Sequence, residues 1–145
     1  MARAYFSTVF ENPADEIWTV VRDFGNYAWA GVVAETTIEE GKAGDAVGAV
    51  RNVRSGGKLI RQRLLAHSDL DRCYTYELCD PLPFPVHDYQ ATLRVTPIID
   101  GNRAFIEWWA TFDCAADERE RWTSYFTHDG FAKWLQALRS FVMPA

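Results

Sequence analysis

The segment RAFIEWWATFD, residues 103–113, has an apolar side chain at every second position along its whole length. Because successive side chains of a β-strand point to opposite faces, this period predicts a strand with one buried face. The inward residues are Ala104, Ile106, Trp108, Ala110 and Phe112. Similar alternation marks residues 46–53, 59–68, 73–78 and 87–95. The chain is therefore predicted to form an antiparallel sheet with one apolar face.

Helical signals stand at both ends of this run of strands. A first strand over residues 2–11 is followed by Asn12, which we expect to cap a helix with Pro13 at its first position. A second short helical turn is predicted within residues 26–31, before a strand over residues 32–40. From Asp117 onward the spacing is helical, and its apolar positions include Trp122, Phe126, Trp134, Leu138 and Phe141.

These elements predict an α+β helix-grip fold, in which a curved antiparallel β-sheet wraps around a long C-terminal α-helix and two short helices follow the first strand. A length of 145 residues fits one domain, residues 1–145. A curved sheet closing on one helix tends to leave a cavity. The cavity would be lined generously, because 14% of the residues are aromatic.

Charge and composition narrow the classes of partner. A net charge of −5 disfavours nucleic acid and anionic membranes, which attract clustered Lys and Arg. An odd number of cysteines, three, and an N-terminus without a long apolar run predict a cytoplasmic, reduced protein. The sequence has no metal-ligand spacing, phosphate loop or nucleophile motif, so we expect no metal and no cofactor.

The most informative polar residue is Arg51, which alternation places on the same face as Val47, Ala49 and Val53. An arginine cannot lose its charge to suit an apolar setting, and burying it unpaired costs on the order of several kcal/mol. Either a protein carboxylate neutralises Arg51, or a cavity holds it for a polar group of a ligand. No acidic residue is predicted on the inner face of a central strand, which favours the ligand.

Gln62, Tyr76 and Tyr89 are also predicted to face inward from neighbouring strands, toward Arg51. Each has an alternative structural role, Gln62 as a partner of Arg51 and the tyrosines as core aromatics with satisfied hydroxyls. Gly130, inside the last helix, either leaves room for a ligand or allows close packing of helix on sheet.

Five motifs in order resemble the polyketide cyclase/dehydrase branch of the SRPBCC superfamily, which also contains START lipid-transfer domains and the birch pollen allergen. They are VGAVRNV (47–53), QRLLAHSD (62–69), YTYEL (74–78), HDYQATLRV (87–95) and IEWWATFD (106–113). The branch includes lachrymatory factor synthase, and plant abscisic-acid receptors are near relatives. The resemblance implies a cavity with Arg51 as its arginine.

The resemblance also implies that Tyr76, Tyr89 and Trp108 form the aromatic lining around Arg51, and it implies a gate. The full set of residues expected to bind ligand is Arg51, Gln62, Tyr74, Tyr76, Tyr89, Ala91, Trp108, Phe126, Gly130 and Trp134. The gate, by similarity to two receptor loops, is Ser55, Gly56, Gly57, Phe84, Val86 and His87. Gln62 departs from the pattern, because these relatives carry an acid there and an amide cannot act as a general base.

Three functions remain open at this point. The first is binding of a small hydrophobic or aromatic molecule that carries a carbonyl or anionic group, anchored by Arg51. The second is a cofactor-independent cyclase, dehydratase or isomerase in which Arg51 and Tyr89 are catalytic. The third is a homodimeric interaction module that uses the outward-facing Trp109.

Overall fold

The computed structural model describes residues 1–31, 36–55 and 57–143, with the side chain of Ser55 excepted. Its strands are β1 (Ala2–Phe10), β2 (Thr36–Ile38), β3 (Val50–Ser55), β4 (Lys58–Ser68), β5 (Cys73–Leu78), β6 (His87–Ile98) and β7 (Arg103–Asp113). Its α-helices are α1 (Ala14–Val21), α2 (Arg119–Ser124) and α3 (Lys133–Val142). Short 3-10 turns lie at Ala28–Ala30, Glu39–Gly41 and Ala116–Glu118.

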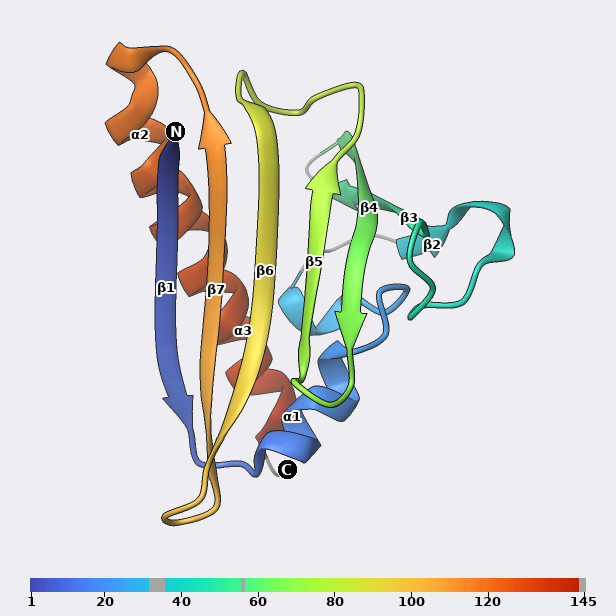
Figure 1. The fold of residues 1–145 in the computed structure, drawn as a ribbon, viewed down its shortest axis with the longest axis vertical. Coiled ribbons are helices and arrows are strands. Elements are labelled where there is room, and N and C mark those ends of the chain that lie inside the picture. The colour runs from blue at the N-terminus through green and yellow to red at the C-terminus, as the bar shows by residue number, and fades with distance from the viewer. Residues whose placement is uncertain (32–35, 56, 144–145) are drawn as a thin grey trace.

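The seven strands form one antiparallel sheet in the order β1-β7-β6-β5-β4-β3-β2. The C-terminal helical segments lie diagonally across one face of this sheet, and α1 closes its lower end (Figure 1). Helix α2 continues through a π-helical stretch, Tyr125–Ala132, into α3, so this end of the chain forms one long rod. The predicted helix-grip architecture is confirmed.

Strand β7 shows why the sheet has one apolar face. Its inward residues are fully buried and pair with inward residues of β6, as Leu93 opposite Trp108 and Ala91 opposite Ala110. Aromatic side chains from the C-terminal segment complete the packing, with Phe131 stacked on Trp108 at a centroid distance of 5.1 Å. Burying such large side chains contributes about 2 kcal/mol each, which drives helix and sheet together.

Two expected alternations break at specific residues. Val47 is 63% exposed, because Gly48 takes a positive φ of 93° and turns the chain before β3 begins at Val50. In β4 a bulge between Leu64 and Ala66 reverses the alternation, so Ala66 is exposed. His67, expected to face outward, has a side chain that is only 7% exposed. The prediction was wrong at all three side chains.

The helix ends also depart from expectation. Pro13 occupies the N-cap position of α1 with an extended backbone, and Asn12 donates instead to the Glu16 side chain at 3.0 Å. Phe141, predicted to be buried in the last helix, is 53% exposed. The strand predicted over residues 32–40 is confined to Thr36–Ile38 among the described residues, and residues 32–35 lie outside them.

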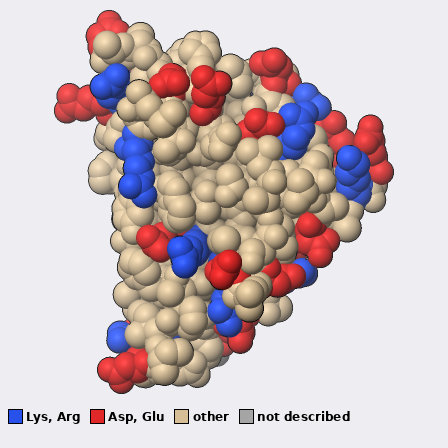
Figure 2. Space-filling model, viewed as in Figure 1, with Lys and Arg blue, Asp and Glu red and all other residues tan. Residues whose placement is uncertain are grey.

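The surface carries both signs of charge. Lys and Arg side chains are interspersed with Asp and Glu over the face seen in Figure 2, which has the same orientation as Figure 1. Trp109 lies on the outer face of the sheet beside Tyr5, with ring centroids 6.5 Å apart. No helix in the described part of the chain is long and apolar enough to span a membrane.

Candidate functional site

An internal cavity of about 210 Å³ lies between the sheet and the C-terminal helical segment. Strands β3, β4 and β5 supply one wall, the loop before β6 and the start of β6 supply another, and the helical segment supplies the third. The lining residues are Tyr27, Val53, Ile60, Gln62, Leu78, Phe84, Tyr89, Tyr125, Phe126, Asp129 and Trp134. Aromatic rings thus form most of the wall, and few polar groups reach it.

Arg51 lies behind this wall and is fully buried. Its Nε donates to Gln62 Oε1 at 2.6 Å, and Nη1 approaches the Phe24 carbonyl oxygen at 3.5 Å. The guanidinium carbon lies 4.0 Å from the centroid of the Phe24 ring and 3.9 Å from that of Tyr27. Cation–π contacts of this kind are worth about 1–2 kcal/mol each. Within the described residues, no carboxylate pairs with Arg51.

The contact with Arg51 fixes the orientation of the Gln62 amide. A guanidinium only donates hydrogen bonds, so the amide oxygen must face it and the amide N–H group must point elsewhere. Gln62 is 6% exposed and lines the cavity. No hydrogen bond among the described residues uses its Nε2. The cavity therefore has an N–H donor in its wall, polarised by a buried positive charge behind it.

Buried tyrosines surround the same region. Burial raises the pKa of Tyr27, Tyr74, Tyr76 and Tyr89 above the ordinary tyrosine value. Tyr27 and Tyr89 line the cavity. Because its pKa is raised, the Tyr89 side chain stays a neutral phenol at physiological pH. A neutral phenol can donate a hydrogen bond to a ligand, but it is a poor proton acceptor. Its raised pKa makes Tyr89 better suited to donating a hydrogen bond than to acting as a general base.

The residues predicted to bind ligand divide into two groups. Gln62, Tyr89, Phe126 and Trp134 line the cavity together. The others are buried but lie outside its lining: Arg51, Tyr74, Tyr76, Ala91, Trp108 and Gly130. In this outer group the Trp108 indole donates to the Tyr76 hydroxyl at 3.2 Å. Arg51 and Trp108 contact the lining from behind, since Arg51 lies against the Tyr27 ring and Trp108 packs on Trp134 at a centroid distance of 5.2 Å.

Of the predicted gate, Phe84 lines the cavity, Val86 is fully buried and His87 is exposed. Gly57 takes a positive φ of 80° in the turn between β3 and β4. Gly56 and the side chain of Ser55 lie outside the described residues. Lys58, directly after this turn, has its Nζ 5.7 Å from the Phe84 ring centroid, so the two rim loops meet there.

Sequence reasoning missed Tyr27, Tyr125 and Asp129 on the cavity wall. Tyr27 lies in an irregular segment after Gly25, where no periodicity points to a face. Tyr125 and Asp129 belong to the π-helical stretch, whose wider turn moves side chains off the 3.6-residue register. The apolar pattern of the sequence YFTHDG, residues 125–130, does not indicate this change from α-helix to π-helix.

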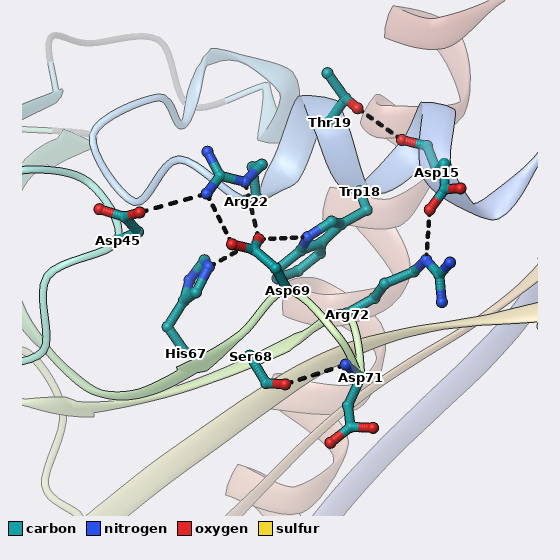
Figure 3. Close-up of polar contacts among 10 residues, drawn as sticks. All are labelled: Asp15, Trp18, Thr19, Arg22, Asp45, His67, Ser68, Asp69, Asp71 and Arg72. Atoms are coloured by element: carbon teal, nitrogen blue, oxygen red, sulfur yellow. Dashed lines mark hydrogen bonds and ion pairs between the residues drawn. The ribbon is translucent and has the colours of Figure 1, made fainter.

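A separate polar cluster ties α1 to the turn between β4 and β5 (Figure 3). The Asp69 carboxylate accepts hydrogen bonds from Trp18 Nε1 at 2.9 Å and Arg22 Nε at 3.0 Å, and His67 Nε2 lies 3.0 Å away. Donors from Arg22, Trp18 and His67 lower the Asp69 pKa below its ordinary value.

The same cluster brings together three residues whose side chains can bind metal ions, Asp45, His67 and Asp69. Arg22, however, contacts both carboxylates, at 3.4 Å from Asp45 and 3.1 Å from Asp69 through Nη2. A cation here would have to displace that guanidinium. We interpret the cluster as a structural ion-pair network.

A second hollow, of about 550 Å³, lies on the solvent side of the C-terminal helical segment. It is lined by Ala116, Arg119, Glu120, Thr123, Ser124, Thr127 and His128. None of these side chains is buried, and none belongs to Phe, Tyr or Trp. The aromatic cavity is therefore the better candidate for a small-molecule site.

Comparisons with known proteins agree with the fold. The family model described as polyketide cyclase / dehydrase and lipid transport matches residues 1–142. A protein of Thermobifida fusca, solved by solution NMR, is 30% identical and superposes with a TM-score of 0.85, covering 96% of this chain and 91% of that one. No curated protein matches the chain.

Two further solved structures show the same fold. An uncharacterised protein of Bacillus thuringiensis is 26% identical, with a TM-score of 0.83 over 97% of this chain and 98% of that one. Norcoclaurine synthase of Thalictrum flavum, in complex with dopamine and hydroxybenzaldehyde, is 16% identical, with a TM-score of 0.75 over 97% of this chain and 85% of that one. The likeness to the synthase shows the fold alone.

Proposed function

Because the chain belongs to the polyketide cyclase/dehydrase and lipid transport family, whose members typically bind hydrophobic ligands in a cavity, we propose that it binds a small, largely apolar carbonyl compound there. The observation that carries the proposal is the 2.6 Å contact between Arg51 Nε and Gln62 Oε1. This contact leaves the Gln62 N–H group as a fixed donor in an aromatic wall. A ligand carbonyl oxygen is the matching acceptor.

The volume of the cavity limits the size of the ligand. An engineered apolar cavity of about 150 Å³ accommodates benzene. A cavity of about 210 Å³ suits a single ring with one or two small substituents. A fused-ring polyketide or a long acyl chain would require the rim loops to move apart.

The positive charge behind the wall sets the polarity of the ligand. Arg51 acts as an anchor through Gln62, because the amide passes the polarising effect of the guanidinium to its own N–H group. A carbonyl or anionic oxygen placed there gains from both groups, and the Tyr89 hydroxyl supplies a second donor in the wall. Phe84 and the loop that contains Gly57 form the proposed gate.

The proposal is tested by titrating the purified protein with acetophenone and with ethylbenzene, followed by NMR chemical shifts. The two compounds have the same ring and similar size, but only acetophenone has a carbonyl oxygen. A net hydrogen bond of about 1 kcal/mol predicts about fivefold tighter binding of acetophenone. Gln62→Leu should remove this preference.

Gln90→Leu is the matched control, because Gln90 is exposed on the outer face of β6 and the chemical change is the same. The control should keep the preference for acetophenone. If neither compound shifts resonances of the cavity residues, the proposed function is refuted. If Gln62→Leu keeps the preference, Gln62 is not the carbonyl contact.

A further inference from the structure

The cavity wall also carries a carboxylate, Asp129, at its exposed end. Asp129 lines the cavity and is exposed, whereas Gln62 lines it and is 6% exposed. The two polar side chains therefore stand at the outer and inner ends of a space that is otherwise walled by aromatic and aliphatic groups. Their hydrogen-bonding roles are opposite, since the carboxylate of Asp129 only accepts hydrogen bonds.

The position of Asp129 on the cavity wall follows from the π-helical stretch to which it belongs. Tyr125, four residues earlier, and Trp134, five residues later, line the same cavity. The carboxylate is close enough to Tyr125 that its negative charge adds to burial in raising the pKa of that phenol. Asp129 thus shares this part of the cavity wall with two aromatic residues.

Asp129 is the one charged residue in the cavity lining among the described residues. Lys58 lies against Phe84 but does not line the cavity, and Arg51 is behind Gln62. Among the described residues, no salt bridge involves Asp129. The lining within the described chain contains no other ionisable carboxylate or any cation. A ligand that reaches from Gln62 to the mouth therefore meets one negative charge at its outer end.

We propose that Asp129 determines specificity by favouring ligands whose outer end carries a hydrogen-bond donor or a positive charge, and by disfavouring ligands with an anion there. The inference rests on the proposed function, because it uses the same cavity and the same carbonyl contact. It narrows the ligand class to small carbonyl compounds with an amine or hydroxyl group opposite the carbonyl. The faces of Tyr125 and Trp134 add attraction for a cation.

Three para-substituted acetophenones test the proposal, because each keeps the carbonyl for Gln62 and places a different group at the mouth. They are 4-acetylbenzylamine, which is cationic, 4-methylacetophenone, which is neutral, and 4-acetylbenzoate, which is anionic. Exposed charge pairs contribute modestly, so we expect about a threefold change in Kd at each step, with the cation tightest. Titrations at low salt maximise the difference.

The matched variants are Asp129→Asn and Asp117→Asn. Both remove one negative charge from the C-terminal segment, but Asp117 is exposed and lies outside the cavity lining. Asp129→Asn should reduce the spread between the three probes to less than twofold, and Asp117→Asn should preserve it. Asp129→Lys should reverse the order.

The outcomes separate this inference from the proposed function. If 4-methylacetophenone binds in the cavity but the three affinities are the same in the parent protein and in Asp129→Asn, the role of Asp129 is refuted and the proposed function stands. If none of the three probes binds, the proposed function fails, and the inference fails with it.

Discussion

Replacing Gln62 with leucine should destabilise the protein more than replacing Arg51 with methionine, although Arg51 is the larger side chain and carries the charge. The reason is the asymmetry of their contact. Gln62 Oε1 accepts the short hydrogen bond that the buried guanidinium donates, at 2.6 Å, and the next polar contact of the guanidinium is with the Phe24 carbonyl oxygen at 3.5 Å. Without Gln62 the charge stays buried with little compensation.

The magnitudes follow from the contacts. A hydrogen bond to a charged group contributes about 1.5–3 kcal/mol, so Gln62→Leu should lower the free energy of unfolding by about 2–3 kcal/mol. Arg51→Met loses the same bond and the ring contacts with Phe24 and Tyr27, about 1 kcal/mol each. It also removes the desolvation penalty of a buried ion, which is several kcal/mol. The net change should stay within about 1 kcal/mol.

Urea unfolding followed by circular dichroism measures both variants. With an m-value of about 2 kcal/mol per molar urea, Gln62→Leu should shift the midpoint down by about 1–1.5 M, and Arg51→Met by less than about 0.5 M. The double variant should be more stable than Gln62→Leu by about 1–2 kcal/mol, because neighbouring sites are not additive. If Arg51→Met costs as much as Gln62→Leu, or if the two losses add, the electrostatic reasoning is wrong.

Two further predictions concern other parts of the molecule. Asp69→Asn should lower stability at pH 7, because donors from Arg22 and the neighbouring residues hold the Asp69 pKa below its ordinary value (Figure 3). The carboxylate stabilises the protein fully above its pKa in the unfolded chain, about 3.9, and this stabilisation is lost as the pH falls toward the lower native pKa. The difference in urea midpoint between the parent protein and Asp69→Asn should therefore shrink from pH 7 to pH 3. A difference that stays constant would contradict this reasoning. Gly130→Ala should stabilise the protein by up to about 1 kcal/mol, because an added Cβ would make an ordinary contact of 3.4 Å with Trp134. Thermal unfolding measures the gain, and acetophenone affinity should not change, since Gly130 is outside the cavity lining; weaker binding would show that Gly130 contacts the ligand.

The strands could be predicted from sequence where one face is continuously apolar, as in β7 and β6, because burial on one side enforces the alternation. The errors fall where backbone geometry intervenes. Gly48 turns the chain at a positive φ and leaves Val47 exposed, and a bulge after Leu64 exchanges the faces of Ala66 and His67. A positive φ or a bulge alters the direction of the side chains without altering which residues of a segment are apolar. The hydrophobic periodicity of the sequence therefore does not reveal either feature.

The candidate site was predictable in part for the same reason. Gln62 and Tyr89 lie on regular strands, and alternation places their side chains toward the cavity that they line. Tyr27 and Asp129 could not be placed, because one lies in an irregular connection and the other in a π-helical turn. Arg51 lies behind the cavity wall because Tyr27 packs over it. These two residues are 24 positions apart, and no local sequence signal predicts their contact.

The ring of Tyr27 separates the cavity, which it lines, from the buried Arg51, whose guanidinium carbon lies 3.9 Å from the ring centroid. A smaller side chain at position 27 would open the cavity toward Arg51, enlarging the space and giving any occupant direct access to a permanent cation. One substitution could thus convert the proposed site for carbonyl compounds into a site for carboxylates. Within this fold, a change of ligand chemistry lies a single residue away, and position 27 is where divergence among homologous proteins should be sought first.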